Sequence, residues 1–187
     1  MFKEEKRQAV HISLLLLAFG LKYLNRFWAV IFLFLLLGVI LFIIPKLRSR
    51  RHFYRREEKI YSKGAVNYFL VLLILVLIFP FEVVGASWGI MALGDGMATL
   101  IGKNFKTKEL FWNKNKSYVG SLAFIIFGVA GSYVLLRWLA PDIAMSTALT
   151  VSFKTVVVAA VVESLPWQID DNISVPLASA VVLSWLI

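Results

Sequence analysis

Seven apolar runs follow one another along this chain, and each approaches the length of a membrane-spanning helix. A bilayer core requires about 20 apolar residues in a helix, with a range of roughly 17 to 25. Only 17% of the residues are charged, whereas a soluble domain carries about 25%. We therefore predict an all-α, polytopic membrane helix bundle of about seven transmembrane helices. The runs span about 9–24, 27–45, 64–80, 82–102, 119–139, 145–165 and 174–187.

Lysine and arginine are concentrated in two of the loops between these runs. Residues 46–63 contain eight of them and residues 103–118 contain five. The loops expected on the other side of the membrane contain only Lys22, Arg26 and Arg137. Because short cytoplasmic loops carry the excess of positive residues, we expect both basic loops and the N-terminus in the cytoplasm. The net charge of +9 then reflects membrane topology, so we expect no nucleic-acid partner.

We interpret residues 1–187 as a single integral membrane domain. It would consist of an N-terminal helix pair (1–45), a basic cytoplasmic loop (46–63) and a catalytic helix bundle (64–187). The sequence indicates no particular oligomeric state.

The side chains available for metal binding are restricted. The chain has no cysteine and only two histidines, His11 and His52. Thiol nucleophiles, thiolate metal sites and His-rich zinc sites are therefore excluded. Carboxylates remain as metal ligands, and oxygen ligands favour magnesium-type chemistry.

Ionisable residues within an apolar run are unfavourable in a bilayer and often functional. Here they are Asp95, Lys154 and Glu163. Asp95 lies between two glycines, which allow the backbone or a ligand to come close. We interpret it as a metal ligand and a catalytic candidate. Small residues around it recur every four positions and predict a tight helix–helix seam; they are Gly85 and Gly89, and then Gly94, Ala98 and Gly102.

The second basic loop ends in a stretch suited to phosphate. Ser117, Gly120 and Ser121 lie at the start of the following run. Hydroxyls, glycine and free N–H groups at a helix N-terminus suit a phosphate, and lysine adds a point charge. An ordinary positive-inside loop would also explain the lysines, but it would not explain these three residues.

A third polar cluster follows the sixth apolar run. Asp170 and Asp171 could cap the last helix together with Asn172, or they could bind magnesium as adjacent carboxylates. Glu163 lies about two turns earlier, near the same membrane face.

The expected topology places all of these candidates on the cytoplasmic side. Carboxylates for a metal and lysines for phosphate, together within a bundle in lipid, indicate phosphoryl or nucleotidyl transfer at the membrane surface. The chain has no Walker motif, and Gly94 and Gly96 are not a dinucleotide fingerprint because no βαβ unit surrounds them.

These motifs resemble the CTP-dependent polyprenol kinase family, which includes phytol kinase, dolichol kinase and the yeast-type diacylglycerol kinase. They are similar, more distantly, to phosphatidate cytidylyltransferase. The resemblance extends over residues 85–177 and follows the family's order of motifs. It is carried by residues 92–102, 113–123, 163–164 and 170–176.

The resemblance implies Mg²⁺-dependent transfer of a phosphoryl group from CTP, or another nucleoside triphosphate, to a lipid alcohol such as phytol, polyprenol, dolichol or diacylglycerol. It implies that Asp95, Asp170 and Asp171 bind the metal. The basic residues and the histidine of the family's first helix are matched only loosely by Lys6, Arg7 and His11. The residues implied to contact nucleotide phosphates are Lys103, Lys114, Lys116, Ser117 and Ser121.

Two other functions remain open from the sequence. A phosphatidate cytidylyltransferase, which makes a CDP-lipid, would use the same metal, triphosphate and lipid. A small transporter could use Lys154 and Glu163, but nine residues place them about 180° apart around a helix. The catalytic base is equally open among Asp95, Asp170 and Glu163. The implied partners are a lipid alcohol, a nucleoside triphosphate and the bilayer, with the active site of this multi-pass protein facing the cytoplasm.

Overall fold

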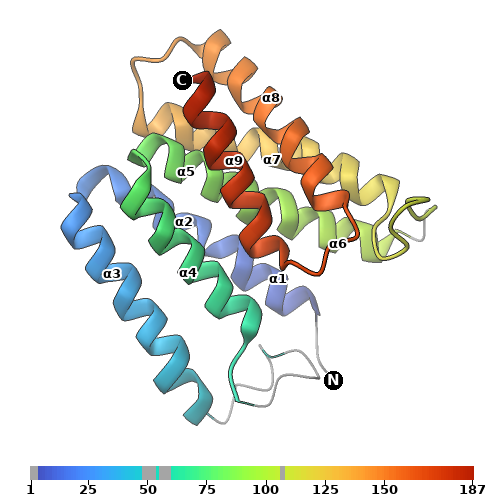
Figure 1. Ribbon diagram of the computed structural model, residues 1–187, viewed down its shortest axis with the longest axis horizontal. Coiled ribbons are helices and arrows are strands. Elements are labelled where there is room, and N and C mark those ends of the chain that lie inside the picture. The colour runs from blue at the N-terminus through green and yellow to red at the C-terminus, as the bar shows by residue number, and fades with distance from the viewer. Residues whose placement is uncertain (1–3, 48–53, 55–59, 106–107) are drawn as a thin grey trace.

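The computed structural model describes residues 4–47, 54, 60–105 and 108–187. These residues fold almost entirely into helices, and the described part of the chain has one isolated β-bridge, between Glu109 and Ser117. Figure 1 shows the arrangement. In chain order the helices are α1 (Glu4–Ser13), α2 (Leu15–Phe19), the 3₁₀ turn η1 (Gly20–Tyr23), α3 (Arg26–Gly38), the π-helix η2 (Val39–Ile43), the 3₁₀ turn η3 (Ile44–Lys46), α4 (Lys63–Ile78), α5 (Phe81–Gly89), the π-helix η5 (Ile90–Asp95), α6 (Gly96–Asn104), α7 (Tyr118–Leu139), α8 (Met145–Ser164) and α9 (Asp171–Leu186).

The all-α prediction is confirmed, but the prediction of about seven spanning helices is corrected. In the described residues, four continuous helices are long and apolar enough to cross a membrane. They are Arg26–Lys46, Phe81–Asn104, Tyr118–Leu139 and Met145–Ser164.

The remaining apolar runs form shorter helices. Helices α4 and α9 have 16 residues each. Pro80 limits α4, because the residue before a proline is driven out of the helical region and Phe79 is extended. The first run does not form one regular helix, since α1 is followed by the five-residue α2 and a 3₁₀ turn.

A seam of glycines joins the two central helices. Helices α5, η5 and α6 follow one another as one continuous helix, and this helix packs along α7. A Cβ added at Gly89 would overlap the backbone of Gly131, and one at Gly94 would lie 3.3 Å from the Cα of Gly128. The backbones therefore approach more closely than larger side chains would permit. The seam predicted from the spacing of small residues is confirmed.

The N-terminal helices pack on the same bundle. Helix α1 lies against η5 and α6, and His11 Nε2 donates a hydrogen bond to the Met91 carbonyl oxygen at 3.1 Å. Helix α9 lies between α8 and the pair α4 and α5 (Figure 1). Most of the basic loop 46–63 falls outside the described residues, so its predicted role stays a prediction.

Candidate active site

Asp95 is the last residue of the π-helix η5. A π-helix is rare, and single π-turns within α-helices occur frequently at functional sites. Here the π-helix joins α5 to α6, and the Asp95 side chain is 13% exposed. Asp95 Oδ2 lies 3.8 Å from His11 Nε2. The carboxylate is therefore positioned by the seam on one side and by α1 on the other.

Two further carboxylates come from the junction between α8 and α9. Glu163 lies in the last turn of α8, and its side chain is only 3% exposed. Asp171 is the first residue of α9 and is 34% exposed. Asn172 fixes this end of α9 by donating a hydrogen bond from Nδ2 to the Gly64 carbonyl oxygen of α4, at 3.2 Å.

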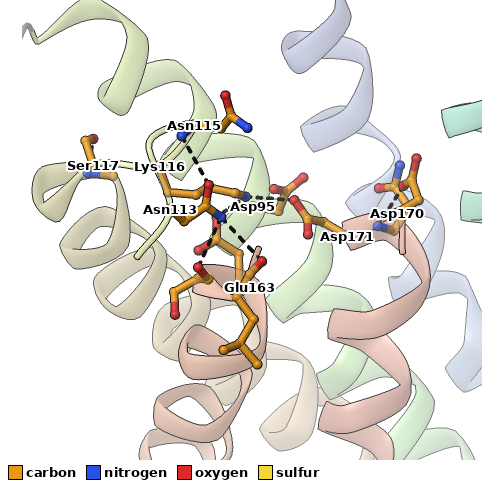
Figure 2. A network of polar contacts seen from close by, with 12 residues as sticks. Asp95, Asn113, Asn115, Lys116, Ser117, Glu163, Asp170 and Asp171 are labelled. Carbon is orange, nitrogen blue, oxygen red and sulfur yellow. Dashed lines mark hydrogen bonds and ion pairs between the residues drawn. The ribbon is translucent and has the colours of Figure 1, made fainter. Parts of the chain in front are cut away.

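Asp95, Glu163 and Asp171 converge on one point, and we call them the carboxylate cluster. One oxygen from each lies within 4.8 Å of the others. Figure 2 shows them gathered around Lys116. Three negative charges and one positive charge leave a formal charge of −2 when all four groups are ionised. Clustered, partly buried carboxylates repel one another and lose solvation, so they require compensating cations.

Lys116 is the cation that the structure brings to the carboxylate cluster. Its Nζ donates to Asp171 Oδ2 at 2.7 Å and forms a second ion pair with Glu163 Oε1. Burial opposes protonation of the lysine, but the charges of Glu163, Asp95 and Asp171 outweigh burial and raise the pKa of Lys116 above its ordinary value. Lys116 therefore remains charged at neutral pH.

The loop that carries Lys116 is fixed to the C-terminal end of α8. Asn113 is buried, and its Nδ2 donates to the Ser164 and Leu165 carbonyl oxygens at 3.1 and 3.3 Å. Trp112 Nε1 also donates to the Ser164 carbonyl oxygen, at 3.0 Å. These bonds satisfy carbonyls that the helix end leaves unpaired, and they hold Lys116 against Glu163.

Two polar cavities adjoin the carboxylate cluster. The first, the lysine cavity, has a volume of about 460 Å³ and is lined by Lys103, Lys114 and Lys116. The second, the carboxylate cavity, has about 430 Å³ and is lined by Asp95 and Asp171. The two share Lys116 in their walls. Both volumes fall within the range of roughly 300 to 1,000 Å³ typical of small-molecule sites.

The helix start predicted to bind phosphate lines the lysine cavity. Ser117 is the N-cap of α7, and its Oγ accepts a hydrogen bond from the Gly120 amide at 3.1 Å. The Ser121 hydroxyl is buried without a hydrogen-bond partner among the described residues, and its side chain lines the same cavity. Because Ser117 Oγ accepts in the cap, its hydroxyl proton can still be donated, so both serines can donate a hydrogen bond to a ligand.

Asp170 takes a different position from its neighbour Asp171. It is the N-cap of α9, and its Oδ1 accepts a hydrogen bond from the Asn172 amide at 3.0 Å. Figure 2 shows its side chain to one side of the group around Lys116. Of the two roles expected for the Asp170–Asp171 pair, the structure gives the cap to Asp170 and brings Asp171 together with Glu163 and Asp95.

Sequence reasoning gave little weight to three residues of the site. Arg7 and Thr99 line both polar cavities, and Asn113 anchors the loop. Thr99 lies four residues after Asp95, so the helical period could have placed it on the same face. Arg7 was only loosely matched to the family's first helix, and Asn113 lies in a stretch that carries the resemblance. Neither match placed the residue at the site, because the packing that brings them there joins segments far apart in the sequence.

Comparison with known proteins identifies relatives. The chain is 39% identical over 138 residues to a probable chloroplastic phytol kinase of Triticum aestivum, a match covering 68% of this chain and 45% of that protein. It is 37% identical over 135 residues to phytol kinase 1 of Arabidopsis thaliana, covering 67% and 43%. It is 38% identical over 95 residues to the farnesol kinase of Arabidopsis thaliana, covering 48% and 31%.

By sequence, this chain belongs to the phytol and farnesol kinase family. The resemblance to polyprenol kinases is therefore confirmed. The chain spans about half the length of the curated relatives it matches. No family model matches the chain, and no solved structure matches it.

Proposed function

We propose that this chain is a membrane-embedded kinase that transfers the γ-phosphoryl group of CTP to a lipid alcohol in a Mg²⁺-dependent reaction. The observation that carries the proposal is the carboxylate cluster paired with Lys116 in the wall between two polar cavities. Kinship with phytol and farnesol kinases supports the class of acceptor. Phytol, polyprenol or dolichol, and diacylglycerol are the acceptors to be compared.

The carboxylate cluster fits a divalent cation. Magnesium prefers carboxylate oxygens, and all three side chains supply them. Glu163 Oε2 is buried and has no hydrogen-bond partner among the described residues. A cation of charge +2 would neutralise the remaining charge of the cluster. Asp95, Glu163 and Asp171 would hold the ion, which would supply charge neutralisation and orientation of the triphosphate.

We assign triphosphate binding to the lysine cavity. Lys103, Lys114 and Lys116 provide positive charge there, and the N-terminus of α7 provides Ser121 and the backbone around Gly120. Phosphate groups are stabilised by helix N-termini and by lysine. Phosphoryl transfer depends mainly on such positioning and charge stabilisation.

The chemical step requires one new bond and one broken bond. The acceptor's hydroxyl oxygen attacks the γ-phosphorus, and the bond from that phosphorus to the bridging oxygen of CDP breaks. The hydroxyl proton passes to a carboxylate, for which we propose Asp95, because it lines the carboxylate cavity. Asp170 would act by capping α9 and fixing Asp171.

The side of the membrane is also part of the proposal. The Lys and Arg residues of both basic loops favour the cytoplasm, so we propose that this multi-pass protein opens its active site there. The transporter alternative is less well supported, because Lys154 is exposed midway along α8 whereas Glu163 is buried at its end.

The test uses purified protein in detergent with Mg²⁺ and CTP labelled at the γ-phosphate. Phytol, farnesol, dolichol, diacylglycerol and phosphatidate are offered separately, and ATP, GTP and UTP replace CTP in parallel. Label in an alcohol supports the kinase and identifies the acceptor. Labelled pyrophosphate released only with phosphatidate would instead establish the cytidylyltransferase. No Mg²⁺-dependent transfer from any triphosphate would overturn the proposal.

A further inference from the structure

A third cavity lies beside the two polar ones and has an apolar lining. This apolar groove has a volume of about 390 Å³ and lies between α1, the α3–η2 segment and α4. Most of its wall is aliphatic or aromatic, as in sites for apolar small molecules. Its apolar lining includes Val10, Leu14, Val39, Ile40, Ala65 and Phe69.

The α3–η2 wall of the groove packs only partly against the protein, because Leu36 and Ile40 contact the core but are half-buried. Helix α3 buries only Ala29 and Leu33, and η2 has no buried residue. Val39 and Ile40 are half-buried and line the groove, whereas Leu41 is exposed on the outer side. The second half of this helix therefore presents one apolar face to the groove and another to its surroundings.

The groove ends beside the carboxylate cluster. Arg7 and Asn172 line both the apolar groove and the carboxylate cavity. His11 also lines the groove, and its Nε2 lies 3.8 Å from Asp95 Oδ2. An elongated molecule with an apolar chain and one polar end would find matching surroundings for both parts.

We propose that the apolar groove holds the hydrocarbon chain of the acceptor and directs its terminal hydroxyl to Asp95. This inference rests on the proposed function for the chemistry at the hydroxyl, and on the groove for the chain. We assign one hydrocarbon chain to this groove of about 390 Å³. The acceptor is therefore a single-chain isoprenoid alcohol and not a two-chain diacylglycerol.

The first arm of the test does not depend on turnover. A C15 to C20 alcohol carrying a photoreactive diazirine on its chain is crosslinked to the full protein in detergent, and the labelled peptides are mapped. Crosslinks are expected in α1, in residues 36–44 and in residues 65–69. Excess phytol should compete for them, and an alkane of equal length without the hydroxyl should compete less well.

The second arm narrows the groove with matched variants. Val39→Trp and Ala65→Trp place a large ring in it, while Leu41→Trp places the same ring on the outer face of η2. We expect crosslinking to fall at least about tenfold in the first two, because even one methylene in an apolar pocket changes binding by roughly 10- to 200-fold. In Leu41→Trp it should stay at wild-type level. Gel filtration confirms that each variant is folded.

The outcomes separate this inference from the kinase proposal. Groove crosslinks that Val39→Trp removes would support the inference even if no phosphate were transferred. Crosslinks scattered over the outer surfaces of the helices, unaffected by Val39→Trp and Ala65→Trp, would overturn it even in an active kinase. In an active enzyme, efficient phosphorylation of diacylglycerol with no effect of Val39→Trp on the KM for phytol would also overturn it.

Discussion

Lys116 Nζ donates to Asp171 Oδ2 at 2.7 Å, which joins the loop before α7 to the first residue of α9 across 55 positions of sequence. The same ammonium group pairs with Glu163 in α8. One lysine thus ties together three segments at the wall between the lysine cavity and the carboxylate cavity. Loss of Lys116 should weaken nucleotide binding and should increase the electrostatic repulsion among the three carboxylates.

Lys116→Ala is expected to raise the KM for the nucleotide by roughly one to two orders of magnitude, since charge-assisted hydrogen bonds contribute about 1.5 to 3 kcal/mol. The KM for the lipid alcohol should change little. Initial rates at varied CTP measure the effect. Lys108→Ala is the control, because Lys108 is exposed in the same loop. Equal effects of the two variants would show that the KM for the nucleotide depends on the total positive charge of the loop and not on the position of Lys116.

Magnesium is expected to stabilise the folded protein through the carboxylate cluster. A ligand at a hundred times its Kd adds about 2.7 kcal/mol to the free energy of unfolding. Thermal unfolding in detergent with and without Mg²⁺ measures this, with Ca²⁺ as a comparison. Glu163→Gln should reduce the Mg²⁺-dependent shift in Tm, whereas Glu5→Gln, an exposed change in α1, should retain it. A shift that survives in Glu163→Gln would place the ion elsewhere.

Asn113→Ala should lower both stability and activity. The variant removes the Nδ2 donor from the Ser164 and Leu165 carbonyl oxygens, and among the described residues only the Ser164 oxygen keeps a second donor, Trp112 Nε1. The loss of a hydrogen bond of this kind costs about 0.5 to 1.5 kcal/mol. Because Lys116 then loses its anchor, the KM for the nucleotide should rise as well. Asn104→Ala at the exposed end of α6 is the control. A stability loss with unchanged KM would limit Asn113 to a structural role.

Gly89→Ala tests the seam between α5 and α7. The new Cβ would overlap the Gly131 backbone, and overpacking of this kind costs about 1 to 3 kcal/mol. Gly20→Ala meets nothing within 4 Å and should be neutral or slightly stabilising. Thermal unfolding of the two variants measures the difference. Equal Tm values would show that the two helices can separate at no cost.

Much of the bundle follows from sequence because apolar runs, small-residue spacing and prolines act locally. The glycines around Asp95 predicted the seam, and the run lengths predicted helices. The breaks in the first run were not predicted, because hydropathy alone does not distinguish an α-helix from a 3₁₀ turn. The four-residue period of the small residues breaks between Gly89 and Gly94, which are five positions apart, and the π-helix Ile90–Asp95 occupies this break.

The site was predictable as a set of residues but not as an assembly. Topology placed Asp95, Lys116 and Glu163 at one end of the bundle. It could not decide which member of the Asp170–Asp171 pair caps α9, because that depends on the backbone at a single junction. The contribution of Arg7 from α1 was indicated only by a loose match to the family's first helix, because it depends on tertiary packing.

The most direct test of the central claim is phosphate transfer by Asp95→Asn. We expect Mg²⁺-dependent transfer of labelled γ-phosphate from CTP to phytol or farnesol by the wild type. The variant should fall at least roughly a hundredfold in kcat, as when a general base is removed, with its fold and its Tm in the absence of Mg²⁺ retained. Asp142→Asn, an exposed change before α8, should behave as wild type. Wild-type turnover by a folded Asp95→Asn protein would contradict the assignment of the active site.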